Sequence, residues 1–163
     1  MGPAEIRRQV AGHPRGLVIT SRTQLAEWAH SAEAKVDRGW ATYVISAEGA
    51  LLLAPRRTEH VVCAGGQPVR CAGELRVDEI GEILEISNNS TGYCPSEDTW
   101  PAVENSLSGA GLGSPGRFTF LAIFRRCEVC GQRNLVKDDW FECAVCKADL
   151  PAVWNFTASF SAR

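Results

Sequence analysis

Cysteines are the residues of this 163-residue chain with the clearest chemistry, and four of its seven stand at the spacing of a metal site. The stretch 127-CEVCGQRNLVKDDWFECAVC-146 contains two Cys-x-x-Cys pairs separated by 12 residues. Each pair can form a tight turn, and a hairpin between the pairs would gather four thiolates around a tetrahedral Zn²⁺ at about 2.3 Å. Gly131 follows the first pair, where such a turn often needs a positive φ. We expect one zinc ion with the ligands Cys127, Cys130, Cys143 and Cys146.

The predicted zinc site is closed, because the chain supplies all four ligands and leaves no open position for a substrate. We therefore expect the zinc to be structural. The segment resembles a four-cysteine zinc ribbon; iron in a rubredoxin-like site, a redox Cys-x-x-Cys and four unrelated buried cysteines are the alternatives. Basic residues near the site would suit a nucleic-acid-binding adaptor. Acidic neighbours offset them, and a zinc bound by four thiolates adds about two negative charges, so nucleic acid is disfavoured as a partner.

A second group of potentially reactive residues lies in and around 86-ISNNSTGYCPSEDTW-100. Cys94 could be a nucleophile that His60 activates, with Asp98 or Glu97 orienting the imidazole of His60, although no helix N-terminus directly follows Cys94. A second zinc site could combine His60 with the remaining cysteines, Cys63, Cys71 and Cys94. On a regular strand, however, His60 and Cys63 would point to opposite faces. The third interpretation is that these cysteines are small buried apolar residues.

The middle of the chain resembles a known family. The order 60-HVVCAGGQPVRCAGEL-75, a strand, 90-STGYCPSEDTW-100 and a helix is similar to the central domain of plant proteins with an IQ calmodulin-binding motif, which has fungal and bacterial relatives. The matching residues are His60, Ala72, Gly73, Ser90, Tyr93, Pro95, Glu97, Asp98 and Trp100. The chain departs from the family's Ser-Gly-His-Tyr-x-Pro loop at Thr91 and Gly92, and Cys94 occupies the unspecified position. The resemblance covers about 40–112 and implies regulatory binding to other proteins, without calmodulin because no IQ helix is present.

The residues that the resemblance marks for ligand or partner binding are His60, Ser90, Tyr93 and Asp98. The imidazole of His60 and the hydroxyl of Tyr93 could meet in a small polar pocket. A transferase or hydrolase would need these two groups to converge in an open cleft beside a carboxylate such as Glu74 or Asp98. Alternatively, the small polar residues of the loop could satisfy the backbone of their own loop.

The hydrophobic pattern predicts an α+β fold with a mostly antiparallel, curved sheet of five or six strands, two helices and a C-terminal zinc-ribbon hairpin. Seven segments are candidates for these five or six strands: 16–20, 41–45, 50–54, 60–64, 69–77, 82–87 and 118–124. One helix should follow a cap at Thr20 or Ser21 and end near Gly39, and a second should run from Trp100 to about Ser108 with Thr99 as its cap. The expected organisation is a flexible arm at 1–15, an α+β domain at 16–124, and a zinc ribbon with a packed C-terminal tail at 125–163.

Composition limits the class of protein. With 45% hydrophobic residues and a formal net charge of -2, the chain can fill a core and has no overall basic field for nucleic acid. No apolar run approaches the roughly 20 residues of a membrane span, and no signal peptide is recognisable, so free or metal-bound thiols in a reducing cytoplasm are expected. The sequence therefore predicts a zinc-binding, non-catalytic protein-interaction or regulatory module. Its expected partner is another protein, with a small ligand as a second option and no membrane.

Overall fold

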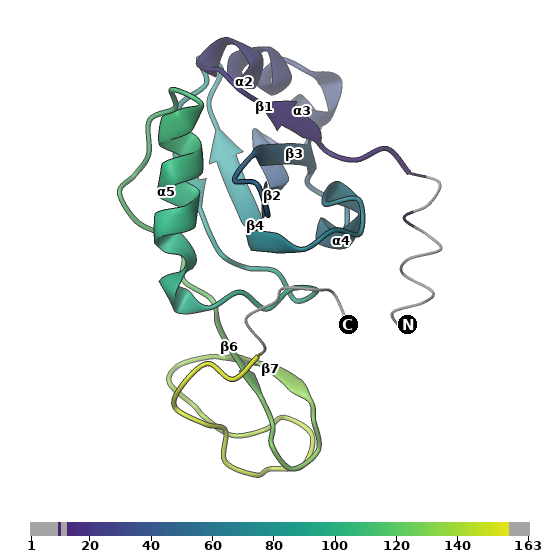
Figure 1. Ribbon diagram of the computed structural model, residues 1–163, viewed down its shortest axis with the longest axis vertical. Helices are drawn as coiled ribbons and strands as arrows, with labels where there is room; N and C mark the ends of the chain where they lie inside the picture. Colours follow the sequence, from purple (N-terminus) through teal and green to yellow (C-terminus); the bar gives the residue numbers. More distant parts are fainter. Residues whose placement is uncertain (1–9, 11–12, 157–163) are drawn as a thin grey trace.

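An antiparallel sheet forms the first part of the molecule, and a two-stranded ribbon follows it (Figure 1). The computed structural model describes residue 10 and residues 13–156. The sheet has five strands in the order β1-β3-β2-β4-β5, and the ribbon pairs β6 with β7. The strands are β1 (Leu17–Ile19), β2 (Trp40–Ser46), β3 (Leu51–Pro55), β4 (Val69–Val77), β5 (Ile83–Ile86), β6 (Ile123–Arg126) and β7 (Arg133–Val136). The expected α+β fold with a C-terminal hairpin is confirmed.

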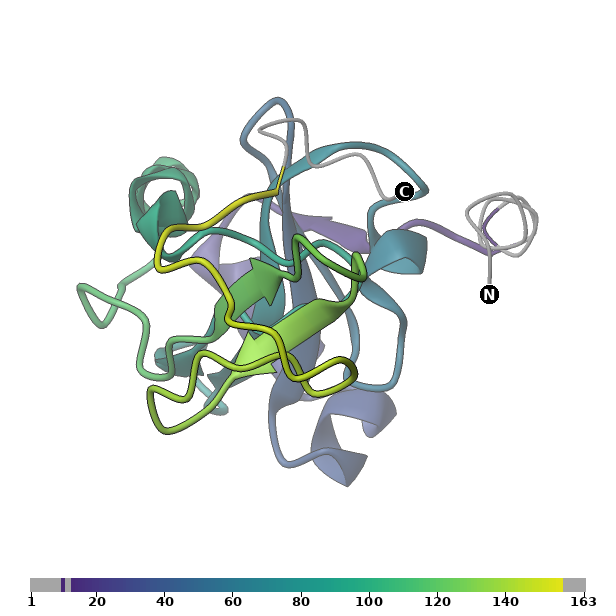
Figure 2. The same cartoon turned by 90° about the horizontal axis from the view of Figure 1, so that it is seen from below.

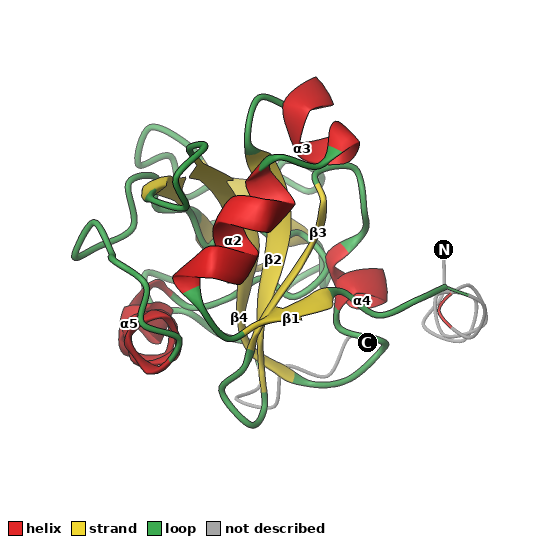
Figure 3. Cartoon of the chain, turned by 90° about the horizontal axis from the view of Figure 1, so that it is seen from above, coloured by secondary structure: helices red, strands yellow, loops and turns green. Residues whose placement is uncertain are grey.

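Both faces of the sheet are covered, because successive apolar side chains of its strands point to opposite sides. Tyr43 and Ile45 of β2 belong to one core cluster, and Val44 between them belongs to the other. The helices are α2 (Arg22–Ala29), α3 (Ala32–Val36), α4 (His60–Cys63) and α5 (Trp100–Gly109). Helices α2, α3 and α5 contribute to the cluster of Tyr43, and α4 contributes to that of Val44. Figure 3 shows α2 lying across the strands, with α5 seen end-on beside them.

The predicted helix that ends near Gly39 is divided into α2 and α3. Ser21 is the cap of α2, since its hydroxyl accepts a hydrogen bond from the Gln24 amide at 3.2 Å. Ser31 begins α3 in the same way, because its hydroxyl accepts from the Ala34 amide at 3.2 Å. Gly39 has a φ of 80° and donates to the Ala34 carbonyl, which ends the helical turns where the sequence placed their end.

The prediction of a strand at 60–64 is wrong, because these residues form α4 and its C-cap. The two valines of the segment favoured a strand. Gly65 and Gly66 adopt φ values of 64° and 75°, and their amides donate to the carbonyls of Val62 and Val61 at 2.9 and 2.8 Å. These bonds close a helical turn that L side chains at the two glycines would disfavour.

The prediction of a buried strand at 118–124 is wrong in its first part. Strand β6 begins only at Ile123, and the preceding Phe120 makes an isolated parallel bridge with Ser87. Phe120 and Leu121 are 55% and 46% exposed. The partner strand of β6 is β7, so the apolar run is shared between a connector and the ribbon.

The second predicted helix is confirmed as α5, but Thr99 does not cap it with its side chain. The Thr99 hydroxyl instead donates to the Ser96 carbonyl at 2.8 Å. The Ser96 hydroxyl accepts from the Asp98 amide, which supports a short 3₁₀ turn (Glu97–Thr99) before α5.

The arm expected at 1–15 lies mostly outside the described residues, and so do residues 157–163 of the tail. The proposed division at 124/125 stays a prediction. Among the described residues, no helix has the length and apolarity needed to cross a membrane.

Candidate metal centre and its seat

The four ribbon cysteines converge on one point. Their sulfur atoms all lie within 4.8 Å of one another. The distance from Cys127 Sγ to Cys146 Sγ is 3.5 Å, and that from Cys130 Sγ to Cys143 Sγ is 3.6 Å. A tetrahedron with Zn–S bonds of about 2.3 Å has S–S edges of about 3.8 Å. The four thiols therefore fit one zinc ion.

Two equivalent turns present the sulfurs. The amide of Gly131 donates to the Cys127 carbonyl at 2.9 Å, and the amide of Lys147 donates to the Cys143 carbonyl at 3.0 Å. Gly131 has a φ of 75°, as the sequence predicted, and Lys147 at the matching position has a φ of 63°. A lysine in this conformation is strained, and such strain persists where the surroundings hold it in place. The two turns are therefore near copies that face each other across the metal position.

Backbone amides inside each turn favour the thiolate form at one sulfur of each Cys-x-x-Cys pair. The amides of Cys146 and Val145 lower the pKa of Cys143 to about 6. Hydrogen bonds from the amide of Cys130 likewise lower the pKa of Cys127. Thiolates rather than thiols bind zinc, so these amides favour the form that coordinates.

Asn134 of β7 is a supporting residue that the sequence analysis missed. It is 7% exposed, and its side-chain carbonyl accepts from the Ala144 amide at 3.0 Å. Its side-chain amide donates to the Gln132 carbonyl at 3.0 Å and to Cys143 Sγ at 3.7 Å. Asn134 thus joins the two cysteine turns and contacts one sulfur, which is the kind of partner that orients metal ligands. The position of Asn134 between the two Cys-x-x-Cys pairs is the sequence feature that could have indicated this role.

The ribbon is held against the sheet by the loop that follows β5, residues 87–96, which we call the seat loop. Asn88, which is fully buried, donates to the Ala122 carbonyl at 2.9 Å and accepts from the Ala122 amide at 2.7 Å. Arg133 of β7 donates to the Gly92 carbonyl at 3.0 Å, and the Trp154 indole donates to the Cys94 carbonyl at 2.9 Å. Figure 2 looks at the molecule from the ribbon side, with the ribbon and the chain after it in front of the sheet.

Arg125 is the polar centre of this junction. Its side chain is 5% exposed and pairs with Glu97 at 2.6 Å. Its guanidinium also donates to the carbonyls of Phe124, Pro151 and Ala152 at distances from 2.8 to 3.3 Å. The sequence analysis treated Arg125 only as one of several basic residues near the cysteines. The structure makes it the buried link between the ribbon, the tail and the 3₁₀ turn before α5.

The described residues of the tail contact the ribbon. The side chain of Asn155 accepts from the Arg126 amide and donates to the Arg126 carbonyl, both at 2.8 Å. Phe156 packs against a cluster formed by Cys94, Ala122 and Phe124. The tail therefore connects the outer edge of β6 with the seat loop, up to the last described residue.

His60 and Tyr93 each end on a backbone carbonyl. His60 Nε2 donates to the Gly73 carbonyl at 3.0 Å, which fixes the proton on that nitrogen. The pKa of His60 is lowered, mainly because the imidazole is buried. The Tyr93 hydroxyl donates to the Gln67 carbonyl at 2.8 Å, and burial raises the pKa of Tyr93. These two bonds to backbone carbonyls disfavour the open cleft that the enzyme hypothesis requires of His60 and Tyr93.

The other two candidate residues lie in the same loop. Ser90 is buried, and its hydroxyl accepts from the Tyr93 amide at 3.4 Å. Asp98 is exposed at the 3₁₀ turn. These contacts support a structural role for Ser90, and ligand or partner binding by His60, Ser90, Tyr93 and Asp98 stays a prediction.

The three remaining cysteines are buried and separate. Burial raises the pKa of Cys63 to about 12 and that of Cys94 to about 11, and it also raises the pKa of Cys71. Within the described part of the chain, the ribbon cysteines are the only group with the spacing of a metal site. Cys94, with a φ of 48°, packs at the junction with the ribbon, which favours the interpretation as a small buried residue.

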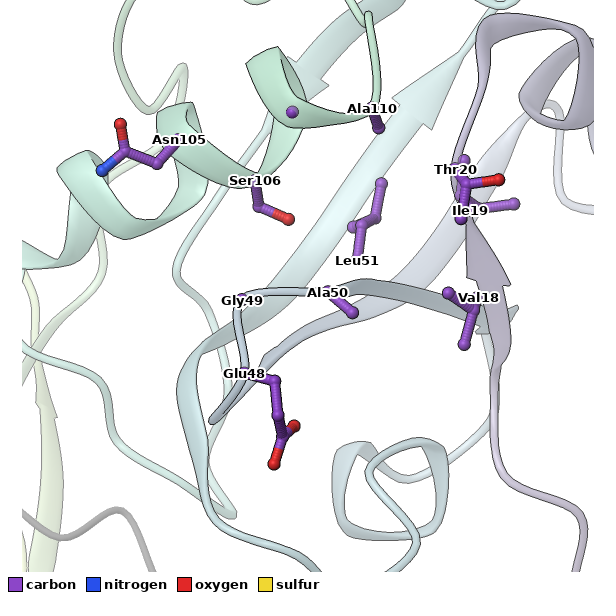
Figure 4. A pocket seen from close by; sticks show the side chains of 11 residues that line it. Val18, Ile19, Thr20, Glu48, Gly49, Ala50, Leu51, Asn105, Ser106 and Ala110 are labelled. Carbon is purple, nitrogen blue, oxygen red and sulfur yellow. The ribbon is translucent and has the colours of Figure 1, made fainter.

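A cavity of about 280 Å³ opens between α5 and the strands β1 and β3 (Figure 4). Ser106 of α5 points toward it, and its hydroxyl is buried without a hydrogen-bond partner. Glu48 at the rim has its pKa lowered by the Ser46 hydroxyl and points away from α5. The cavity has room for a small group, but neither His60 nor Tyr93 lines it.

The four-cysteine centre and its seat are thus the features on which a functional interpretation rests. The family resemblance of residues 40–112 concerns the sheet and the seat loop, and it stays a prediction. No protein-family model matches the chain, and no curated protein or solved structure is significantly similar to it.

Proposed function

We propose that this protein is a non-catalytic protein-interaction module whose zinc ion is structural. The observation that carries this proposal is the closed arrangement of four cysteine sulfurs within 4.8 Å of one another. With four thiolates bound, a tetrahedral zinc has no position for a substrate or an activated water. The metal would supply only a rigid junction between two turns. Catalysis at this centre is therefore disfavoured, and a scaffolding role is favoured.

The zinc would stiffen a platform that projects from the sheet. The buried cluster of the ribbon contains Cys127, Val136, Cys143 and Leu150, so two of its four buried members are ligands. Such a small core rarely holds a fold by apolar burial alone. With the metal in place, Arg125 and Asn88 transmit the order of the ribbon to the seat loop through the hydrogen bonds described above.

The outer surface of the ribbon suits contact with another protein. Val129 and Val145 occupy matching positions in the two turns and are 76% and 65% exposed. Trp140 is 68% exposed beyond the end of β7. Large exposed apolar side chains in a small structure mark interaction surfaces, and tryptophan is enriched at the centres of such surfaces.

Nucleic-acid binding is less well supported by the arginines of the ribbon. The guanidinium of Arg125 is enclosed by carbonyls and Glu97, and that of Arg133 contacts the seat loop. Phosphate contacts need accessible cations, and a zinc bound by four thiolates would add negative charge. These features favour a protein as partner.

Cobalt substitution tests the closed centre. We expect one Co²⁺ per chain and the intense visible absorption of a tetrahedral thiolate site, unchanged when cyanide or imidazole is added. A spectrum that shifts with either ligand would show an open position and contradict the structural role.

The interaction role is tested by affinity capture from the cells that express the protein. We expect the Trp140→Ser and Val129→Ser/Val145→Ser variants to retain zinc but to lose captured protein relative to a His60→Gln variant. Equal capture by all of these variants would contradict an interaction through the ribbon.

A further inference from the structure

A groove with a volume of about 460 Å³ lies on the side of the ribbon. Residues 120–123 of the connector and β6 form one wall, and residues 135–139 of β7 and the following turn form the other. None of the four cysteines lines it. This ribbon groove is therefore distinct from the metal centre, although the hairpin that the metal holds together forms both walls.

The floor and one wall of the ribbon groove are apolar. Phe120 and Leu121 are 55% and 46% exposed, and Ile123 and Leu135 are half-buried. Burial of exposed apolar surface is favourable. The connector that precedes β6 thus leaves two large apolar side chains in water beside a hollow, which is typical of a surface that another molecule covers.

The other rim is an acidic turn. Asp138 and Asp139 have φ values of 52° and 56°, and the Trp140 amide donates to the Lys137 carbonyl at 2.9 Å. This is the geometry of a type I′ turn, where Asn-Gly is the usual pair. The carboxylates of Asp138 and Asp139 make no ion pair among the described residues, and the Trp140 indole beside them has no hydrogen-bond partner there. The rim therefore presents two unpaired negative charges and an exposed aromatic ring.

We propose that the ribbon groove binds a segment of a partner protein that combines apolar side chains with Lys or Arg. This inference rests on the proposed interaction function and names its surface and partner class. Apolar side chains of the segment would cover Phe120 and Leu121. Its cations would pair with Asp138 and Asp139 and stack on Trp140, and the charge of a zinc bound by four thiolates would add to the attraction. Lys137 at the same turn would discriminate against a purely basic segment.

A displayed library of random 12-residue peptides, selected against the zinc-loaded full chain, tests this inference. We expect selected peptides to share apolar residues next to Lys or Arg, and their affinity to fall with rising salt. Asp138→Asn/Asp139→Asn removes the charge while keeping side chains that tolerate positive φ. This variant and Leu121→Asp should each weaken binding at least about tenfold. Val36→Asp, at an exposed position of α3 outside the ribbon, is the matched control and should bind normally.

The possible outcomes distinguish a failure of the groove proposal from a failure of the proposed interaction function. Peptides that lose affinity only in the Val129→Ser/Val145→Ser variant would overturn the ribbon groove and leave the interaction function standing. Peptides without Lys or Arg would overturn the partner class. No selected peptide, together with no variant-dependent capture from cells, would overturn both. Concentration-dependent dimerisation that Leu121→Asp abolishes would identify a second copy of the chain as the occupant and contradict the proposal.

Discussion

The sheet and the ribbon of this protein are stabilised in different ways. The sheet buries apolar side chains on both faces, with Tyr43, Ile45 and Leu75 fully inaccessible in one cluster and Val44 and Leu52 in the other. The ribbon has a small cluster in which cysteines replace part of the hydrophobic core. Two packed faces can hold a sheet without a metal, whereas the ribbon needs its ligands to be joined. If zinc has the structural role proposed above, its loss should affect the ribbon and leave the sheet folded.

The two regions meet through polar contacts as well as packing. Asn88, Asn134 and Asn155 each use a side-chain amide to pair with backbone groups, in the seat loop, in β7 and in the tail. Arg125 is buried among carbonyls beside Glu97. Buried polar groups are stabilising only while their partners stay in place, because each unpaired group is costly to bury. The junction should therefore depend on the order of the ribbon.

The largest effect is expected from the metal ligands. Cys127→Ser/Cys130→Ser should reduce the zinc content from about one per chain to none and unfold the ribbon, because the remaining cluster is too small to hold it. Metal analysis and amide NMR spectra measure both effects. Cys63→Ala, at a buried cysteine of the sheet domain, is the control and should keep its zinc. Full zinc content in the double variant would contradict the assignment of Cys127 and Cys130 as metal ligands.

The next largest effect is expected at the junction. Arg125→Met leaves the Glu97 carboxylate without its cation, and losing one partner of a buried pair costs about 3–5 kcal/mol. Urea unfolding of the zinc-loaded protein measures the change in the free energy of unfolding. Arg76→Met is the matched control, because its pair with Glu85 is partly exposed and should contribute at most about 1 kcal/mol. Equal losses of unfolding free energy in the two variants would show that the Arg125 pair stabilises the protein no more than a partly exposed pair does.

A smaller loss is expected at the seat loop. Asn88→Ala removes two hydrogen bonds to the backbone of Ala122 and leaves buried groups unpaired, at a cost of about 1–3 kcal/mol. The neighbouring Asn89→Ala should change the free energy of unfolding by less than about 0.5 kcal/mol, since the Asn89 side chain makes no hydrogen bond to the described residues of the ribbon. Thermal unfolding of the two zinc-loaded variants tests this difference, and a neutral Asn88→Ala would contradict the role of the loop as a seat.

The smallest effect is a pH dependence that belongs to the sheet domain. Burial lowers the pKa of His60 in the folded state, so the unfolded chain binds more protons as pH falls through its usual pKa of about 6.5. His60 therefore removes stability toward lower pH, by at most about 1.4 kcal/mol per pH unit. Unfolding at pH 7.5 and 5.5 should show a smaller pH-dependent loss in His60→Gln than in the parent chain. The metal titrates in both proteins, so the difference isolates His60; identical losses would contradict this assignment.

The metal centre was predictable because its ligands follow a local spacing. Much of the remaining structure was less predictable because it depends on contacts between residues far apart in the chain. The two Cys-x-x-Cys pairs and Gly131 specify their turns within a few residues, so the ligands could be read from the sequence. In the loop 87–99, the Asn88 side chain and the Cys94 carbonyl bond to Ala122 and Trp154, which lie far along the chain, and the sequence did not predict these contacts. No local sequence pattern predicts contacts between residues so far apart in the chain. At 60–64, two glycines after the segment overrode the strand preference of two valines.

Hydrogen exchange before and after zinc removal by a chelator tests the central claim most directly. We predict that loss of the metal abolishes amide protection in β6, β7 and both cysteine turns, and weakens it at Thr91–Cys94, while β2 and β4 stay protected. This result would show that zinc holds the ribbon on a sheet that is stable without it. Unchanged protection in β6 and β7 after zinc removal, or equal loss throughout the sheet, would contradict the account.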